Sequence, residues 1–235
     1  MRVAPPQSWR SLTVSDCAPE RHSSSDPPAG TGGYAFVHTQ PGSDEPVRWD
    51  PCREIRYVVA GTAPAGAETA VADVVAQLTA ATGLVFVDAG TTDERATDAD
   101  REPYQPGRYG DRWAPLLIDW TDPNTIPDLA GNTAGLGGGQ VVTAPDGRRT
   151  YVTGTITLDA PQVTDGLASF ATAGDPGGPA TARALVMHEL GHVLGLAHID
   201  DPHQLMHATS PVRELGDGDR RGLAILGQGG CEPRL

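Results

Sequence analysis

Lysine is absent from this sequence of 235 residues, so all 17 basic residues are arginine. The 30 acidic residues outnumber them and give a formal net charge of −13. Proteins that bind nucleic acid or anionic membranes usually present clustered positive charge, so this composition argues against both partners. The sequence also lacks a run of about 20 apolar residues, the length that a membrane-spanning helix needs. We therefore expect no membrane span.

Cysteine is scarce, with three residues at Cys17, Cys52 and Cys231. None of them has the CxxC spacing of a redox motif or a zinc ribbon. We expect Cys52 and Cys231 to form a disulfide that joins the start of the domain to its end and stabilises it by about 3 to 5 kcal/mol. Cys17 is then left over.

Residues 1–33 are rich in proline, serine and glycine. Such a segment cannot bury enough apolar surface to order itself, so we predict a disordered tail, a linker or the remnant of a propeptide. Residues 34–235 are long enough for one good-sized core, and nothing in them requires two. We predict a single domain over this range.

Alternating and helical apolar patterns predict the elements of this domain. Residues 34–39 and 46–49 flank a turn-like PGSDE and suggest a short hairpin. A strand (54–60), a helix (68–82) and a buried strand (84–88) follow, and this β-α-β order implies a parallel strand pair. The later predictions are a strand at 115–120, strands at 135–144 and 151–158 joined by a turn, and helices from about 180 to 194 and over 215–226.

The most informative stretch is HELGHVLGLAH, residues 188–198. His188 and His192 are four residues apart, so on a helix both imidazoles can face one metal ion. Glu189 can take a proton from a metal-bound water without being a ligand itself. Gly195 lets the chain turn out of the helix, which brings His198 round as the third ligand. The chance of this whole pattern arising at random is on the order of 3 in 100,000, whereas HExxH alone has odds of roughly 1%.

A methionine follows the third histidine at Met206, after the turn-forming Asp200, Asp201 and Pro202. With the motif HExxHxxGxxH, this chain resembles the metzincin zinc peptidases and, among them, the matrixins. The resemblance implies an α/β (α+β) zincin fold: a twisted, mostly parallel sheet with an antiparallel edge strand, an active-site helix, a methionine turn and a C-terminal helix. It also implies that Met206 is a hydrophobic floor beneath the histidines and not a ligand.

Two positions depart from the family patterns and leave the subfamily open. Ile199 directly follows the third histidine, where matrixins have serine or threonine and adamalysins have aspartate. Ala208 stands where astacins and serralysins have a tyrosine that reaches the metal. Two interpretations of His207 stay open, a donor to the oxyanion and a structural hydrogen bond.

The hairpin over residues 135–158 resembles the one that provides the edge strand above the metzincin cleft. An exposed edge carries unpaired N–H and C=O groups to which an extended peptide can add. Gln140, Val141, Val142 and Thr143 are the candidates for this role. A glycine-rich surface hairpin without a ligand is the alternative.

Residues 91–113 form a long acidic loop that could suggest calcium. Its spacing matches no EF-hand loop, so a solvated run of charges is the better interpretation. Matrixins often hold structural calcium and a second zinc, but their ligands cannot be mapped onto this chain. Calcium is thus possible but not assignable.

Matrixin propeptides carry a cysteine that blocks the zinc and keeps the enzyme latent. Residues 15–20 around Cys17 do not reproduce that family's sequence, and a free or intermolecularly paired thiol is the alternative.

We therefore expect a zinc endopeptidase with one catalytic Zn²⁺, Glu189 as general base, protein or peptide substrates and a monomeric state. The alternatives are a catalytically idle, zinc-stabilised binding domain, and an amidase or peptidase restricted to one small substrate. We expect the protein to act outside the cell, although residues 1–10 lack the apolar region of a secretory signal. Either export information is missing from this N-terminus or the protein stays inside the cell, and we favour the first interpretation.

Overall fold

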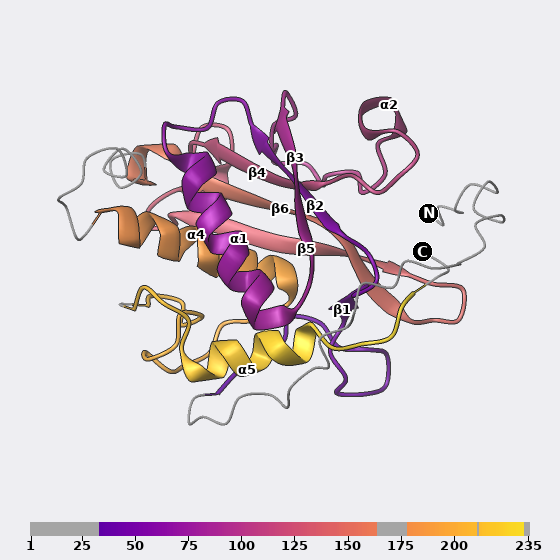
Figure 1. Cartoon of the computed structure of the whole chain (residues 1–235). Helices are drawn as coiled ribbons and strands as arrows, with labels where there is room; N and C mark the ends of the chain where they lie inside the picture. The colour runs from indigo at the N-terminus through magenta and orange to yellow at the C-terminus, as the bar shows by residue number, and fades with distance from the viewer. Residues whose placement is uncertain (1–32, 164–177, 211, 233–235) are drawn as a thin grey trace.

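A six-stranded sheet organises the computed structural model, which describes residues 33–163, 178–210 and 212–232 (Figure 1). The strands are β1 (Arg48–Trp49), β2 (Ile55–Ala60), β3 (Phe86–Thr92), β4 (Leu116–Thr121), β5 (Gly135–Thr143) and β6 (Arg149–Asp159). The helices are α1 (Ala67–Thr82), α2 (Pro106–Tyr109), the 3-10 turn η2 (Pro127–Leu129), α4 (Gly178–Leu194) and α5 (Asp217–Leu226).

The sheet has the order β1-β6-β4-β2-β3, and these neighbours pair in parallel. β5 alone is antiparallel, and it pairs with β6. This arrangement confirms the predicted α/β class with a mostly parallel sheet. The predicted β-α-β unit is present as β2-α1-β3.

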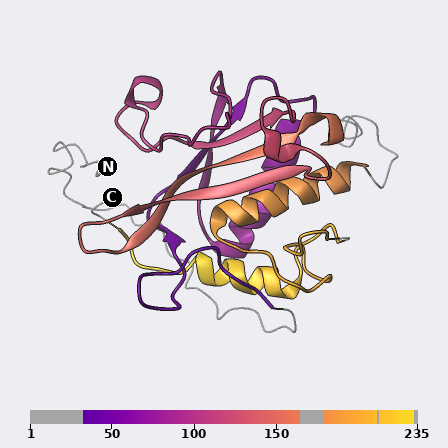
Figure 2. The ribbon, with the colours of Figure 1, turned by 180° about the vertical axis from the view of Figure 1, so that it is seen from behind.

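Alternate residues of the central strands serve two separate cores, because successive side chains point to opposite faces of a sheet. Tyr57 and Val59 of β2 and Ile118 of β4 pack with α1, α4 and α5 in the main core. Val58 and Leu117 point to the other face, where they join a small cluster beneath the loops around residues 96 and 126–129. The helices α1, α4 and α5 therefore cover one face of the sheet, and loops with the short α2 and η2 cover the other (Figure 2).

Two strand predictions are corrected by the structure. The strand predicted at 84–88 begins later, at Phe86, and it is the half-exposed last strand of the sheet. It is less buried than predicted because it has a strand neighbour on one side only. The hairpin predicted from 34–39 and 46–49 is reduced to one bridge, Thr39 with Pro46, because Arg48 and Trp49 pair with β6 instead.

The disulfide predicted between Cys52 and Cys231 is present. It links the loop after β1 to the segment beyond α5, across a sequence separation of 179 residues. The predicted tail lies outside the described residues apart from Gly33, and so does Cys17. No described helix combines the length and the apolarity that crossing a membrane requires.

The acidic loop before β4 is the predicted solvated run of charges at most of its positions, since Asp98, Asp100 and Glu102 are exposed, but two of its charged residues are largely buried. Glu94 and Arg101 form an ion pair at 2.8 Å, and each side chain is only 10% exposed. Arg101 also donates to the Thr153 hydroxyl (2.9 Å) and to the backbone carbonyl of Pro115 (2.9 Å). This loop is thus fastened to β6 and to the start of β4.

A second pair, Arg95 with the fully buried Asp119 of β4, holds the same loop at 2.9 Å. The burial of Glu94 would raise its pKa, but hydrogen bonds from Arg101, Tyr109 and Gln105 and the charge of Arg101 lower that pKa to about 2. Among the described residues, no group of three potential metal ligands lies in this loop. Arg95 and Arg101 therefore neutralise Asp119 and Glu94, two carboxylates that could otherwise have been taken for calcium ligands.

Candidate metal centre and its cleft

The two histidines of the HExxH motif lie one turn apart on α4, which ends at Leu194. Gly195 has a φ of 116°, a left-handed conformation that suits a residue without a β-carbon. The N–H groups of Gly195 and Leu196 both donate to the carbonyl of Gly191, at 3.1 and 2.9 Å. This turn reverses the chain and carries His198 back over the helix.

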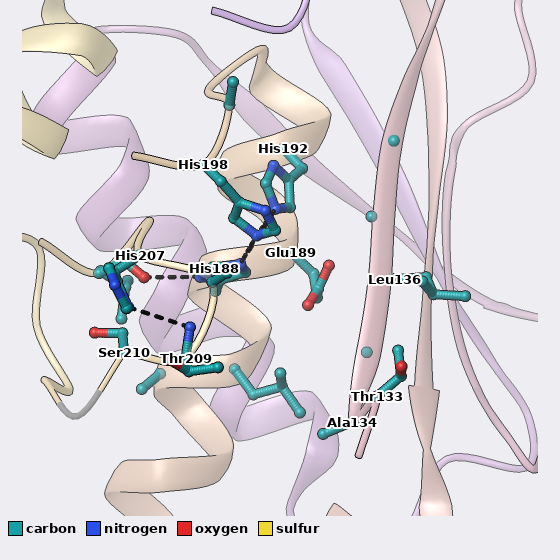
Figure 3. Close-up of a pocket in the computed structure, with 18 of the residues that line it drawn as sticks. Thr133, Ala134, Leu136, His188, Glu189, His192, His198, His207, Thr209 and Ser210 are labelled. Carbon is teal, nitrogen blue, oxygen red and sulfur yellow. Dashed lines mark hydrogen bonds between the residues drawn. The ribbon is translucent and has the colours of Figure 1, made fainter. Parts of the chain in front are cut away.

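The three imidazoles converge on one point (Figure 3). The Nε2 atom of His198 lies 3.1 Å from that of His188 and 3.1 Å from that of His192, and the latter two are 3.2 Å apart. Nitrogen ligands at about 2.0–2.1 Å from a tetrahedral zinc ion would be about 3.3–3.4 Å apart. The donor set and its spacing therefore fit zinc.

Backbone carbonyls set the orientation of two of these rings. His188 Nδ1 donates to the carbonyl of Leu205 at 2.8 Å, and His192 Nδ1 donates to the carbonyl of Leu196 at 2.8 Å. With the proton on Nδ1, the lone pair lies on Nε2, the atom that faces the convergence point.

The electrostatic surroundings favour neutral imidazoles, the form that binds metals. Burial, together with the charges of His192 and His198, lowers the pKa of His188 to about 4, against the opposing effect of the hydrogen bond to the Leu205 carbonyl. Burial also lowers the pKa of His192 and of His198.

Glu189 is buried beside this triad, with 4% of its surface exposed. Figure 3 shows its carboxylate between α4 and β5, apart from the three imidazoles. Burial raises the pKa of Glu189 to about 8. A carboxylate with a raised pKa next to a metal site is suited to accept and return a proton near neutral pH.

Met206 lies beneath the triad with 1% exposure. A β-carbon built on Gly191, between His188 and His192, would lie 2.7 Å from its sulfur atom. The methionine therefore packs against the helix turn that carries two of the histidines, where the resemblance placed it.

A buried carboxylate at the start of α5 holds the turn around Met206. Asp219 accepts hydrogen bonds from the backbone N–H groups of Leu205 (2.6 Å), Met206 (3.3 Å) and Gly216 (2.8 Å). Leu205 in turn accepts the hydrogen bond from His188. Asp219 thus supports one of the three histidines through the backbone of a single residue.

A cleft of about 1400 Å³ runs past the histidines. Its walls include β5 residues 135–139, the helix residues Leu185 and Glu189, and residues 207–210 after the methionine. The candidate edge residues Gln140, Val141, Val142 and Thr143 are not part of its lining. The side chain of Gln140 instead donates to the carbonyl of Arg101 at 2.6 Å, and the register of β5 shifts at the next residue.

Comparison with known proteins gives one family. The family model described as Matrixin matches residues 148–225, roughly a third of the chain. The match supports a matrixin-like family. It includes the three histidines, Glu189, Met206 and Asp219, but not β5.

No curated protein matches the sequence. Among solved structures, the chain is similar to one titled "GM1 bound form of the ECX AB5 holotoxin", with 13% identity and a TM-score of 0.41 over 76% of this chain and 81% of that one.

His207 lies in the cleft, directly after Met206. Its Nδ1 accepts a hydrogen bond from the backbone N–H of Thr209 at 3.3 Å, and its Nε2 is 3.8 Å from a carboxylate oxygen of Asp200. A structural hydrogen bond is therefore present, and a role toward the oxyanion stays a prediction.

The sequence patterns did not indicate one part of the cleft. Phe36, Val37 and His38 line it. Residues 35–37 lie antiparallel to 195–197, since Val37 N–H donates to Gly195 and Ala197 N–H donates to Ala35. This pairing braces the segment that leads to His198. No local motif could have revealed it, because it joins residues about 160 positions apart.

Proposed function

We propose that this chain is a zinc-dependent endopeptidase of matrixin-like type that acts on peptides outside the cell. The convergence of three Nε2 atoms beside a buried glutamate, in a cleft bordered by an edge strand, is the observation that carries the proposal. The matrixin match supports the same class. The disulfide supports an oxidising compartment, where such bonds persist.

His188, His192 and His198 would hold the zinc ion. Bound zinc supplies Lewis acidity, which polarises a carbonyl group and lowers the pKa of a water molecule. Glu189 accepts the proton of the attacking water at its carboxylate and then delivers it to the amine that leaves.

The backbone of residues 135–139 is our candidate for aligning the substrate, in place of the residues that follow it. β5 pairs with β6 on one side only, so its outer edge can accept an extended peptide as one more strand. Four of these five residues are glycines without side chains, so main-chain hydrogen bonds rather than side-chain contacts would hold the peptide along residues 135–139.

The test is to incubate zinc-loaded protein with a diverse peptide library and to identify the cleavage sites by mass spectrometry. We expect cleavage by the parent chain, loss of cleavage with a chelator, and recovery when zinc is returned. Glu189→Ala should keep the zinc and lose nearly all turnover, whereas His192→Ala should lose both. Glu102→Ala, an exposed acidic residue in a loop that does not line the cleft, is the matched control.

Full activity in the Glu189→Ala protein would contradict the assignment of the base. Zinc binding without cleavage of any peptide would instead favour a zinc-stabilised binding domain.

A further inference from the structure

β5 crosses α4 at three alternate glycines, Gly135, Gly137 and Gly139, so no β5 side chain lies between the strand and the helix there. A β-carbon on Gly137 would meet the backbone of Glu189, with its Cα at 2.9 Å, and one on Gly139 would lie 2.6 Å from the carbonyl oxygen of Val193. Both contacts are with backbone, which cannot move aside cheaply. They therefore fix how closely β5 lies on the helix.

Gly135 differs from these two glycines because it faces a side chain. A β-carbon there would lie 2.9 Å from both Cγ and Oε1 of Glu189, and 3.1 Å from its Cδ. The carboxyl group of Glu189 thus fills the volume that a side chain at residue 135 would occupy. Within the described part of the chain, no hydrogen bond holds this carboxylate.

We propose that Gly135 is a positioning residue for Glu189, because the missing side chain at this position leaves the volume between α4 and β5 in which the carboxylate lies. The inference rests on the proposed function, in which Glu189 is the base. A methyl group at residue 135 would be accommodated by rotation of the Glu189 side chain, since β5 itself is held by Gly137 and Gly139. Proton transfer needs heavy atoms within about 2.6–3.2 Å, and a misplacement of about 1 Å can cost on the order of 100-fold in rate.

The first arm of the test is kinetic and uses Gly135→Ala. We expect kcat to fall about 10- to 100-fold, with KM and zinc content nearly unchanged, because the ligands and the cleft edge stay in place. Gly107→Ala, in α2 away from the cleft and with open space around its β-carbon, should leave kcat unchanged. A Gly135→Ala protein with the kcat of the parent would overturn the proposal.

The second arm is independent of activity and uses metal-free protein. Thermal unfolding is compared for Gly135→Ala in the parent chain and in the Glu189→Ala background. We expect Gly135→Ala to lower Tm by about 3 °C or more in the parent chain. In the Glu189→Ala background that penalty should vanish, because the carboxylate that the new methyl group meets is gone.

Gly138→Ala is the matched control for stability. It lies on the same strand, has open space around its β-carbon, and shares the unfolded-state effect of replacing glycine by alanine. An equal Tm penalty for Gly135→Ala in both backgrounds, or one equal to that of Gly138→Ala, would overturn the inference. If the parent chain cleaves no peptide, the proposed function fails, and the unfolding comparison still decides whether residue 135 confines Glu189.

Discussion

Replacement of Glu94 by glutamine should show how much the buried ion pair with Arg101 contributes to stability. Glu94 accepts two hydrogen bonds from Arg101, both at 2.8 Å, and another from Gln105 at 2.6 Å. Arg101 also donates to the β6 residues Thr153 and Gly154. The neutral amide of Glu94→Gln removes the charge and leaves a buried arginine without its counter-ion.

The magnitude follows from the pKa of Glu94, which is lowered from 4.5 to about 2. Each unit of difference between the folded and unfolded pKa is worth about 1.4 kcal/mol, so the ionised Glu94 with all its partners contributes about 3 kcal/mol at pH 7. Because the folded pKa is the lower one, this stability is complete above about pH 5 and is lost as the pH falls toward 2. About 2 kcal/mol of it should be gone at pH 3.

The assay is urea unfolding of metal-free protein at pH 7 and at lower pH. Glu94→Gln should be about 3 kcal/mol less stable than the parent chain at pH 7, and the difference should shrink by about 2 kcal/mol at pH 3. Glu102→Gln, an exposed residue of the same loop, should change little at either pH. A difference between the parent and Glu94→Gln that does not depend on pH would refute the reasoning.

Three further predictions concern the turn around Met206, the disulfide and calcium. Asp219→Ala leaves two buried backbone N–H groups and one partly buried one without an acceptor, and it should weaken zinc binding about 10- to 100-fold in a chelator competition. Unchanged affinity would show that His188 needs no support from α5. Replacing Cys52 and Cys231 by serine opens a loop of 179 residues and should lower the unfolding free energy by up to about 5 kcal/mol, measured in urea against the disulfide-bonded parent. Addition of calcium, or of a calcium-selective chelator, should leave Tm unchanged, because arginines already pair with Asp93 and Glu94 in the loop before β4 and with Asp119 of β4. A rise of several degrees with calcium would contradict that interpretation.

Much of the fold could be predicted from periodicity. The predicted helix 68–82 and strand 54–60 agree with α1 and β2 except for one residue at each start. The agreement is close because apolar spacing and glycine boundaries are local features of the sequence. The half-exposed β3 was predicted as a buried strand, because its apolar start does not reveal that it ends the sheet.

The candidate site was predictable to the extent that it is encoded in one short segment. The motif from His188 to His198 specifies its own geometry through a helix and a glycine turn, and the three imidazoles do meet. The support that Asp219 gives to the turn could not be predicted, because its bonds to Leu205 and Met206 depend on how α5 docks. The same limit applies to Glu94, whose partner Arg101 becomes buried only when the loop packs on β6.

The most direct test of the account is the stoichiometry and coordination of bound zinc. Metal-free protein would be loaded with zinc, dialysed and analysed by elemental analysis and X-ray absorption, with His198→Ala as the comparison. We predict one zinc ion per chain with three nitrogen ligands, and loss of one nitrogen ligand or of the ion in His198→Ala. A parent chain that retains no zinc, or zinc coordination that is identical in His198→Ala, would contradict the central claim.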